Sequence, residues 1–536
     1  MGNRFWLSAV LLVLSVGIAG TAGGSTGRDV QEGGIFRVSF VGSEFDHVDP
    51  ALAYSSSWYL LDTICARLMT YPDKAPPEGL RLVPEVAADH PKISRNGKTY
   101  TFTLRKGFRF SDGTPVRASA FARAINRALI LGDRSGAVQY IADIAGAADV
   151  QAGRTTTAAG VIARGNTLVV RFTRPVLDFA AKTTMPFFCA VPPTLPADPE
   201  GVRAFPGAGP YYVAEYRPGE RVVVRRNRFY GGTRPHHVAG FDVDLRATSQ
   251  PEVLDQVERG EADWGNAVAP AYFAPGRRLA AKYGVNRSRF FVKPGFTMRH
   301  ILFNHSRPLF RDNPRLRQAV NFALDRRALS RAVTNSQLAE RLTDQYLPPT
   351  FPGYRDAAIY PLERPDLSRA RGLARGNTRG GKATLYTADF PQPVALSQLV
   401  GRQLAAIGLT VDVKPIAGRG FVPRLTAPNE PWDLAVILWL PDFIDPATYV
   451  NDLFDSRGSG NLGHFQSKTY DRLMRRAARL RGPERYRAYG ELDIRLARDA
   501  APSAPTSFFN EPTLVSKRVG CIVLRPILDL TAVCLK

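Results

Sequence analysis

Two turn signals set close together constrain the fold of this chain more than any other feature. Asn96-Gly97 precedes a β-branched and aromatic run at 98–104, and Asp112-Gly113 precedes apolar residues with helical spacing at 115–129. The stretch therefore predicts a turn, a strand, a second turn and a helix in that order. This order favours a mixed α/β chain over a purely helical or purely β-stranded one.

The second half of the chain indicates units in which a helix joins two strands. Residues 383–386 have the composition of a strand, 394–407 that of a helix ended by Gly408, and 409–413 that of another strand. This order is typical of an α/β unit. Further predicted elements are strands at 167–172, 211–216, 221–225 and 433–438, a Pro218-Gly219 turn, and one helix over 318–333.

The first residues have the pattern of an export signal. Arg4 supplies a positive charge, an apolar run follows from Phe5, and small residues lead to Ala22. We expect a signal peptide at 1–22 with cleavage near Ala22. The run is short for a membrane of about 30 Å, and no cysteine for lipid attachment lies near the cleavage site. The expected location is therefore the periplasmic space, the cell envelope or the extracellular space.

The chain is strongly basic, with a formal net charge of +23. Such a charge can indicate anionic partners. The basic residues are dispersed along the sequence and arginine dominates, so no nucleic-acid partner is predicted. Two interpretations stay open: attraction to anionic envelope polymers, or a solvated surface that reflects an arginine-rich genome.

Four cysteines are present, and an exported chain can keep them as disulfides. Cys521 and Cys534 flank a short stretch and are the first expected pair, which would contribute about 3 kcal/mol in the chain-entropy model. Cys65 and Cys189 both lie in apolar contexts and form the second candidate pair. Sequence alone does not fix the connectivity.

Several segments, taken in order, resemble the family-5 solute-binding proteins of peptide and nickel ABC importers. The segments are HVDPALAY at 47–54, RNGKTYTFTLRKGFRFSDGTPVRA at 95–118, GAGPYYV at 207–213 with VVVRRNRFYGG at 222–232, FNHSRPLFRDNPRLRQAVNFALDRRAL at 303–329, and WDLAVILWLPDFIDP at 432–446. Each is weak alone, and their order makes the resemblance specific. Most of these residues define the fold, and Tyr100, Phe102, Phe108 and Phe110 are expected in the core.

The resemblance implies a periplasmic-binding-protein fold of type II, cluster C. It has two lobes joined by a hinge, with an extra domain inserted in the first lobe, and the ligand lies between the lobes. The implied divisions are domain I at 33–75, 188–297 and 506–536, domain II at 76–187, and domain III at 298–505. The implied role is capture of a short peptide for the membrane subunits of an ABC importer, by a monomer without a cofactor.

The resemblance also nominates ligand-binding residues. In peptide-binding members a Trp-x-x-Asp segment supplies the carboxylate for the peptide's ammonium, and Trp439 to Asp442 match that spacing. A buried carboxylate needs such a partner. The alternative is that Asp442 caps a loop near Pro446, and Asp445 has the character of a turn residue. The further candidates are Tyr54, Ser55, Ser56, Phe508, Phe509 and Asn510, each with surface-loop or core packing as the alternative.

Other classes of function have less support. The seven histidines show no metal-ligand spacing, although His464 could face the cleft of a metal-chelate receptor. We find no GxSxG, HExxH or GxxxxGK[ST] motif, so an enzyme is not predicted. The alternatives that stay open are a receptor for a metal chelate, an oligosaccharide or an amine-bearing metabolite, a secreted envelope hydrolase, and an envelope-associated binder without transport.

Overall fold

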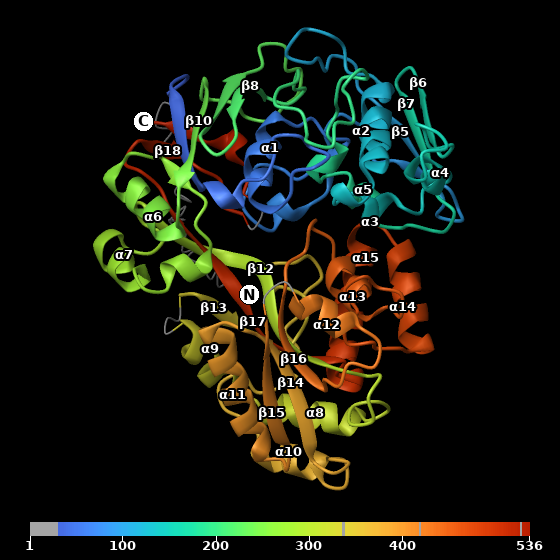
Figure 1. The fold of residues 1–536 in the computed structure, drawn as a ribbon, viewed down its shortest axis with the longest axis vertical. Coiled ribbons are helices and arrows are strands. Elements are labelled where there is room, and N and C mark those ends of the chain that lie inside the picture. Colours follow the sequence, from blue (N-terminus) through green and yellow to red (C-terminus); the bar gives the residue numbers. More distant parts are fainter. Residues whose placement is uncertain (1–30, 335–337, 418–419, 526–527) are drawn as a thin grey trace, which may run out of the picture.

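The computed structural model describes residues 31–334, 338–417, 420–525 and 528–536. Two lobes, the upper one blue to green and the lower one yellow to red, meet along one face and are joined by two long strands (Figure 1). The predicted two-lobed α/β fold is thus confirmed. The predicted signal peptide at 1–22 lies outside the described residues, and the predicted domain boundaries stay a proposal.

The first lobe contains a five-stranded sheet in which β1 lies parallel to two neighbours. Its strands, in sheet order, are β11 (Trp264–Gly265), β1 (Ile35–Val41), β10 (Gly240–Ala247), β9 (Arg221–Arg226) and β8 (Tyr211–Arg217). Phe36, Val38 and Phe40 point to one face and are buried, as alternation along a strand requires. The predicted turn between β8 and β9 is confirmed, with Gly219 at φ +73°.

A four-stranded antiparallel sheet in the same lobe contains the stretch with the two turn signals. Its strands are β4 (Lys92–Ile93), β5 (Thr99–Thr103), β7 (Thr167–Arg171) and β6 (Val161–Arg164). The predicted helix is α2 (Ala118–Leu131), which packs on β6 and β7. The four expected core aromatics are buried, and the Tyr100 ring meets that of Phe179 edge-on at 5.4 Å.

The remaining helices of the first lobe are short. They are α1 (Trp58–Ile64), α3 (Val138–Ile141), α4 (Ala147–Gln151), α5 (Phe179–Lys182), α6 (Gln250–Arg259) and α7 (Gly276–Tyr283). In Figure 1, α3 and α5 lie at the face that meets the second lobe. No helix among the described residues has the length and apolar character needed to cross a membrane.

The second lobe is built on a six-stranded sheet. Its strands, in sheet order, are β13 (Glu340–Leu342), β17 (Ser503–Leu514), β12 (Phe290–Phe303), β16 (Leu434–Trp439), β14 (Lys382–Ala388) and β15 (Thr410–Ile416). The predicted strand–helix–strand unit is confirmed, since β14 and β15 are parallel and α11 (Pro391–Ala405) connects them. The other helices are α8 (Pro314–Ala323), α9 (Arg326–Thr334), α10 (Leu367–Ala374), α12 (Phe421–Thr426), α13 (Ala447–Phe454), α14 (Lys468–Arg479) and α15 (Gly482–Arg495).

The single helix predicted over 318–333 is wrong, because the structure divides this region into α8 and α9. Leu324 between them is extended, with ψ 123°. The Asp325 carboxylate accepts the Ala328 N–H at 2.8 Å, which starts a new helix. The Arg326 guanidinium donates to the Asn321 and Thr343 carbonyls, so buried hydrogen bonds hold the break in place.

Strands β12 and β17 run antiparallel from the first lobe into the second. Their ends Phe290 and Leu514 pack in one apolar cluster with α6 and α7 residues of the first lobe. Their ladder is interrupted between Pro294 and Met298. A break in pairing between two packed bodies is where a hinge can absorb changes in backbone angles.

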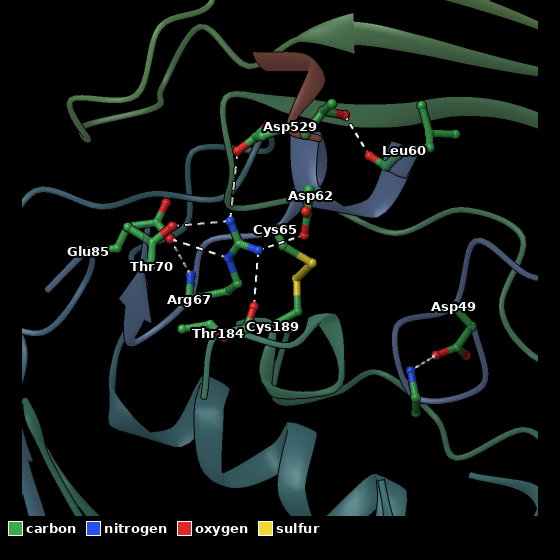
Figure 2. Close-up of a disulfide and its surroundings, with 12 residues drawn as sticks. Asp49, Leu60, Asp62, Cys65, Arg67, Thr70, Glu85, Thr184, Cys189 and Asp529 are labelled. Carbon is green, nitrogen blue, oxygen red and sulfur yellow. Dashed lines mark hydrogen bonds and ion pairs between the residues drawn. A yellow bond between two sulfur atoms is a disulfide. The ribbon is translucent and has the colours of Figure 1, made fainter. Parts of the chain in front are cut away.

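Two disulfides and a buried ionic cluster stabilise the first lobe. The structure joins Cys65 to Cys189, next to the Arg67 guanidinium, and joins Cys521 to Cys534. Figure 2 shows Arg67 donating to Asp62 at 2.6 Å and to the Thr184 carbonyl at 3.0 Å. Arg234 donates to Asp529 at 2.6 Å, so the C-terminal segment is tied into the same cluster. Buried charges are tolerated because each has an opposite partner.

Candidate ligand-binding site between the lobes

The carboxylate of Asp442 lies at the contact between the two lobes. It belongs to the loop that follows β16 in the second lobe, and it accepts hydrogen bonds from two tyrosines of the first lobe. Tyr54 Oη donates to Oδ1 at 2.5 Å, and Tyr140 Oη donates to Oδ2. An ionised carboxylate has about four acceptor positions, so the two tyrosines leave others unused. Asp442 forms no ion pair with any residue that the structure describes.

The two phenols remain proton donors at neutral pH. Burial, followed by the negative charge of Asp442, raises the pKa of Tyr54 and of Tyr140 above the usual value for tyrosine. Tyr54 is held by ring contacts with Trp58 at 5.2 Å and Phe187 at 6.2 Å. The clasp formed by Tyr54, Tyr140 and Asp442 therefore rests on packed aromatic side chains of the first lobe.

A third tyrosine fixes the same loop of the second lobe. Tyr71 Oη donates to the Ile444 carbonyl at 2.9 Å and accepts the Ile444 N–H at 3.0 Å. Both residues are buried. The loop that carries Asp442 is thus bound to the first lobe through its backbone as well as through its carboxylate.

Asp445 has a structural role within the second lobe. Its Oδ1 accepts the Ala447 N–H at 2.8 Å at the start of α13, and it pairs with Arg485 at 2.6 Å. Of the two carboxylates in this loop, Asp442 is therefore the one that faces the first lobe.

Trp439 lies at the end of β16, opposite Met298 of β12. Its ring covers Gly460, where a Cβ atom would come within 2.6 Å of the ring. Its indole N–H is buried and has no hydrogen-bond partner among the described residues. The ring packs on the second-lobe core and is partly exposed.

The other predicted site residues mostly make packing contacts. The Ser56 hydroxyl accepts from Asn266 at 2.8 Å inside the first lobe, and the side chain of Ser55 lies outside the described residues. On β17, Phe508 is buried against Tyr449, Phe509 lies under the Arg299 guanidinium, and Asn510 donates to the Leu338 carbonyl at 2.9 Å.

Within the described ranges, no group of three or more His, Cys, Asp or Glu side chains could coordinate a metal ion. His464 has a positive φ of 56° and its ring lies 6.5 Å from that of Trp432.

A cavity of about 1060 Å³ opens between the lobes beside the Asp442 loop. Residues of α5 and of the β4–β5 turn form one wall, and the α14–α15 turn forms the other. Ile444 and Asp445 also line it, so the cavity adjoins the loop that carries the clasp.

A hinged pair of lobes with a polar clasp and a cavity between them defines a protein that captures ligands by closure. Comparisons with known proteins agree with this class. The model of the family described as "Bacterial extracellular solute-binding proteins, family 5 Middle" matches residues 81–461. The chain therefore belongs to the family-5 extracellular solute-binding proteins.

Individual relatives are distant but cover nearly the whole chain. The peptide transport periplasmic protein SapA of Salmonella typhimurium is 24% identical over 88% of this chain and 87% of its own. The oligopeptide-binding protein OppA of Bacillus subtilis is 22% identical, with 86% of each chain covered. Among solved structures, the clavulanic acid biosynthesis oligopeptide binding protein 2 superposes with a TM-score of 0.85, at 24% identity, over 94% of this chain and 96% of its own.

Tyr140 and Tyr71 were not predicted as site residues. Tyr140 lies in a helix of four residues, and it meets Asp442 across 302 positions of sequence. No local pattern distinguishes such a tyrosine from other partly buried tyrosines.

Proposed function

We propose that this protein is an exported receptor that captures a short peptide between its lobes and delivers it to the membrane subunits of an ABC importer. The observation that carries the proposal is the position of Asp442. Its carboxylate stands between the lobes, has hydroxyl partners and no cationic partner among the described residues, and keeps acceptor positions for an ammonium group.

An ammonium group would complete this arrangement. The Tyr54 and Tyr140 hydroxyls orient the carboxylate, and a peptide amino terminus would supply the missing positive charge. Because the site forms only where both lobes meet, the peptide would favour the closed state by its affinity for that state. The names of the SapA and OppA relatives, which state peptide transport and oligopeptide binding, support the choice of a peptide.

The same proposal includes export to the periplasm or the envelope, the division into domains I, II and III given above, and a binding role without catalysis. The family match and the periplasmic relative support export and binding.

The test is the identity of the ligand that the protein carries. Purified under native conditions, it should release a short peptide with a free amino terminus, detected intact by mass spectrometry after prolonged incubation with the protein. The Asp442→Asn variant should carry less of this peptide, whereas Asp389→Asn, at an exposed acid of the second lobe, should carry the normal amount. A carried oligosaccharide or metal chelate, or a peptide that the protein hydrolyses, would contradict the proposal.

A further inference from the structure

Seven of the residues that line the cavity between the lobes are arginines. Six of them are exposed at its walls and come from both lobes: Arg81, Arg95, Arg355, Arg479, Arg481 and Arg487. The acids of the lining, Asp178 and Asp445, are already paired with Lys182 at 2.9 Å and with Arg485 at 2.6 Å. None of the six arginines forms an ion pair with a residue that the structure describes.

Unpaired cations around a concave surface repel one another and create a strong positive potential. Low-dielectric walls focus that potential into the cavity, which attracts anions. Arginine in particular offers a planar fork that matches the geometry of carboxylate and phosphate groups.

One helix end strengthens this field. Helix α15 begins at Gly482, and Arg481, Gly482 and Pro483 all line the cavity. No side chain caps its first turn. The positive end of the helix dipole therefore adjoins the same space as the arginines, with Glu484 as the one acid of the first turn.

A narrow wall separates this cavity from the Asp442 clasp. The Phe443 ring lies 6.3 Å from the Tyr140 ring, and Lys182 Nζ lies 6.0 Å from the Phe443 ring. Asp445 lines the cavity only three positions after Asp442, so their Cα atoms are at most about 11 Å apart. An acidic clasp and a basic cavity thus lie side by side between the lobes.

We infer that the arginine-lined cavity is a second binding site, which holds a small polyanion with at least two carboxylate or phosphate groups and so bridges the lobes. Two sources have this chemistry: a free polyanion, or the acidic part of the captured ligand. This inference goes beyond peptide capture at Asp442. A site for a free polyanion does not depend on the proposed function, whereas a site for the acidic part of the captured ligand rests on it.

The test compares variants of matched charge. Arg95→Gln with Arg481→Gln removes one arginine from each lobe at the cavity. Arg164→Gln with Arg402→Gln removes two exposed arginines that do not line it, one on β6 and one on α11. Calorimetry measures the binding of citrate, pyrophosphate and the peptides Ala-Glu-Glu and Ala-Ala-Ala. The ionic strength is kept constant because salt screens general attraction to a basic surface.

Saturable binding of citrate or pyrophosphate alone, weakened at least tenfold only by the cavity variant, would establish a site for a free polyanion. Tighter binding of Ala-Glu-Glu than of Ala-Ala-Ala, with the difference lost only in the cavity variant, would assign the site to the ligand's acidic part. If neither pattern appears, or if both double variants weaken binding equally, the inference is overturned. Binding of Ala-Ala-Ala to the cavity variant separates this result from the peptide proposal, because peptide capture at Asp442 does not require Arg95 or Arg481.

Discussion

Tyr71 and Ile444 bind each other through two hydrogen bonds across the contact between the lobes. The phenol donates to the Ile444 carbonyl at 2.9 Å and accepts its N–H at 3.0 Å, both in a buried environment. The pair fixes the backbone of the loop that follows β16. Asp442 lies two positions before Ile444 in this loop and accepts hydrogen bonds from Tyr54 and Tyr140. Contact between the lobes and the position of the carboxylate are therefore linked.

The Tyr71→Phe change should loosen the contact between the lobes. It leaves two buried backbone groups of Ile444 without a partner, which costs about 1–3 kcal/mol each when the lobes stay closed. We expect a larger radius of gyration by small-angle X-ray scattering in the absence of ligand, and peptide affinity reduced about tenfold or more.

The control for this change is Tyr470→Phe. The Tyr470 hydroxyl donates to the Arg495 carbonyl at 3.1 Å, and both residues belong to the second lobe. This variant should keep the wild-type radius of gyration. Equal expansion in both variants would show that the Tyr71 pair does not hold the lobes together.

Removing Arg67 should strongly destabilise the first lobe. The Arg67→Met change leaves the buried carboxylates of Asp62 and Glu85 with less positive charge around them, and breaking a buried pair in this way costs about 3–5 kcal/mol. Arg154→Met, which breaks the exposed pair with Asp149, should cost less than about 1 kcal/mol. Urea unfolding of the two variants measures the difference, and similar free energies of unfolding would contradict the assigned role.

His300 should make the protein less stable in acid. Burial lowers the pKa of His300 from 6.5 to about 3, so the folded state keeps it neutral while the unfolded state binds a proton. Above about pH 6.5 the histidine is neutral in both states and does not lower the free energy of unfolding. As the pH falls from 6.5 toward 3, only the unfolded state binds the proton, so the free energy of unfolding decreases. Between pH 7.5 and 5.0 the loss is about 2 kcal/mol.

The measurement is urea unfolding of wild type and His300→Gln at both pH values. The wild type should lose about 2 kcal/mol more than the variant on acidification. Buried acids such as Asp493, whose burial raises its pKa to about 7, have the opposite pH dependence and are common to both proteins. An equal loss in both proteins would contradict a neutral, buried His300.

The fold could be predicted from the sequence where the signal is local. The turns at Gly97 and Gly113, the hairpin at Gly219 and the strand–helix–strand unit around Gly408 each have a short-range cause, and the structure confirms them. The division of the helix at Leu324 was missed, because the apolar spacing continues across it and the break depends on tertiary hydrogen bonds of Arg326.

The site could be predicted only in part. The Trp-x-x-Asp spacing led to Asp442, but Tyr140 and Tyr71 meet their partners across more than 300 positions of sequence. The arginines of the cavity are spread from position 81 to position 487, so they looked dispersed along the chain. Arg479, Arg481 and Arg487 lie within nine residues, and folding brings them together with Arg81, Arg95 and Arg355.

The most direct test is a double-mutant cycle between Asp442 and the amino terminus of a bound peptide. Calorimetry would give the Kd of a carried peptide and of its N-acetylated form for wild type and for Asp442→Asn. If the carboxylate receives the ammonium, the single changes should each weaken binding about 100-fold, and acetylation should have little further effect on the variant. If acetylation weakens binding to wild type and to Asp442→Asn by the same factor, Asp442 does not bind the ammonium group.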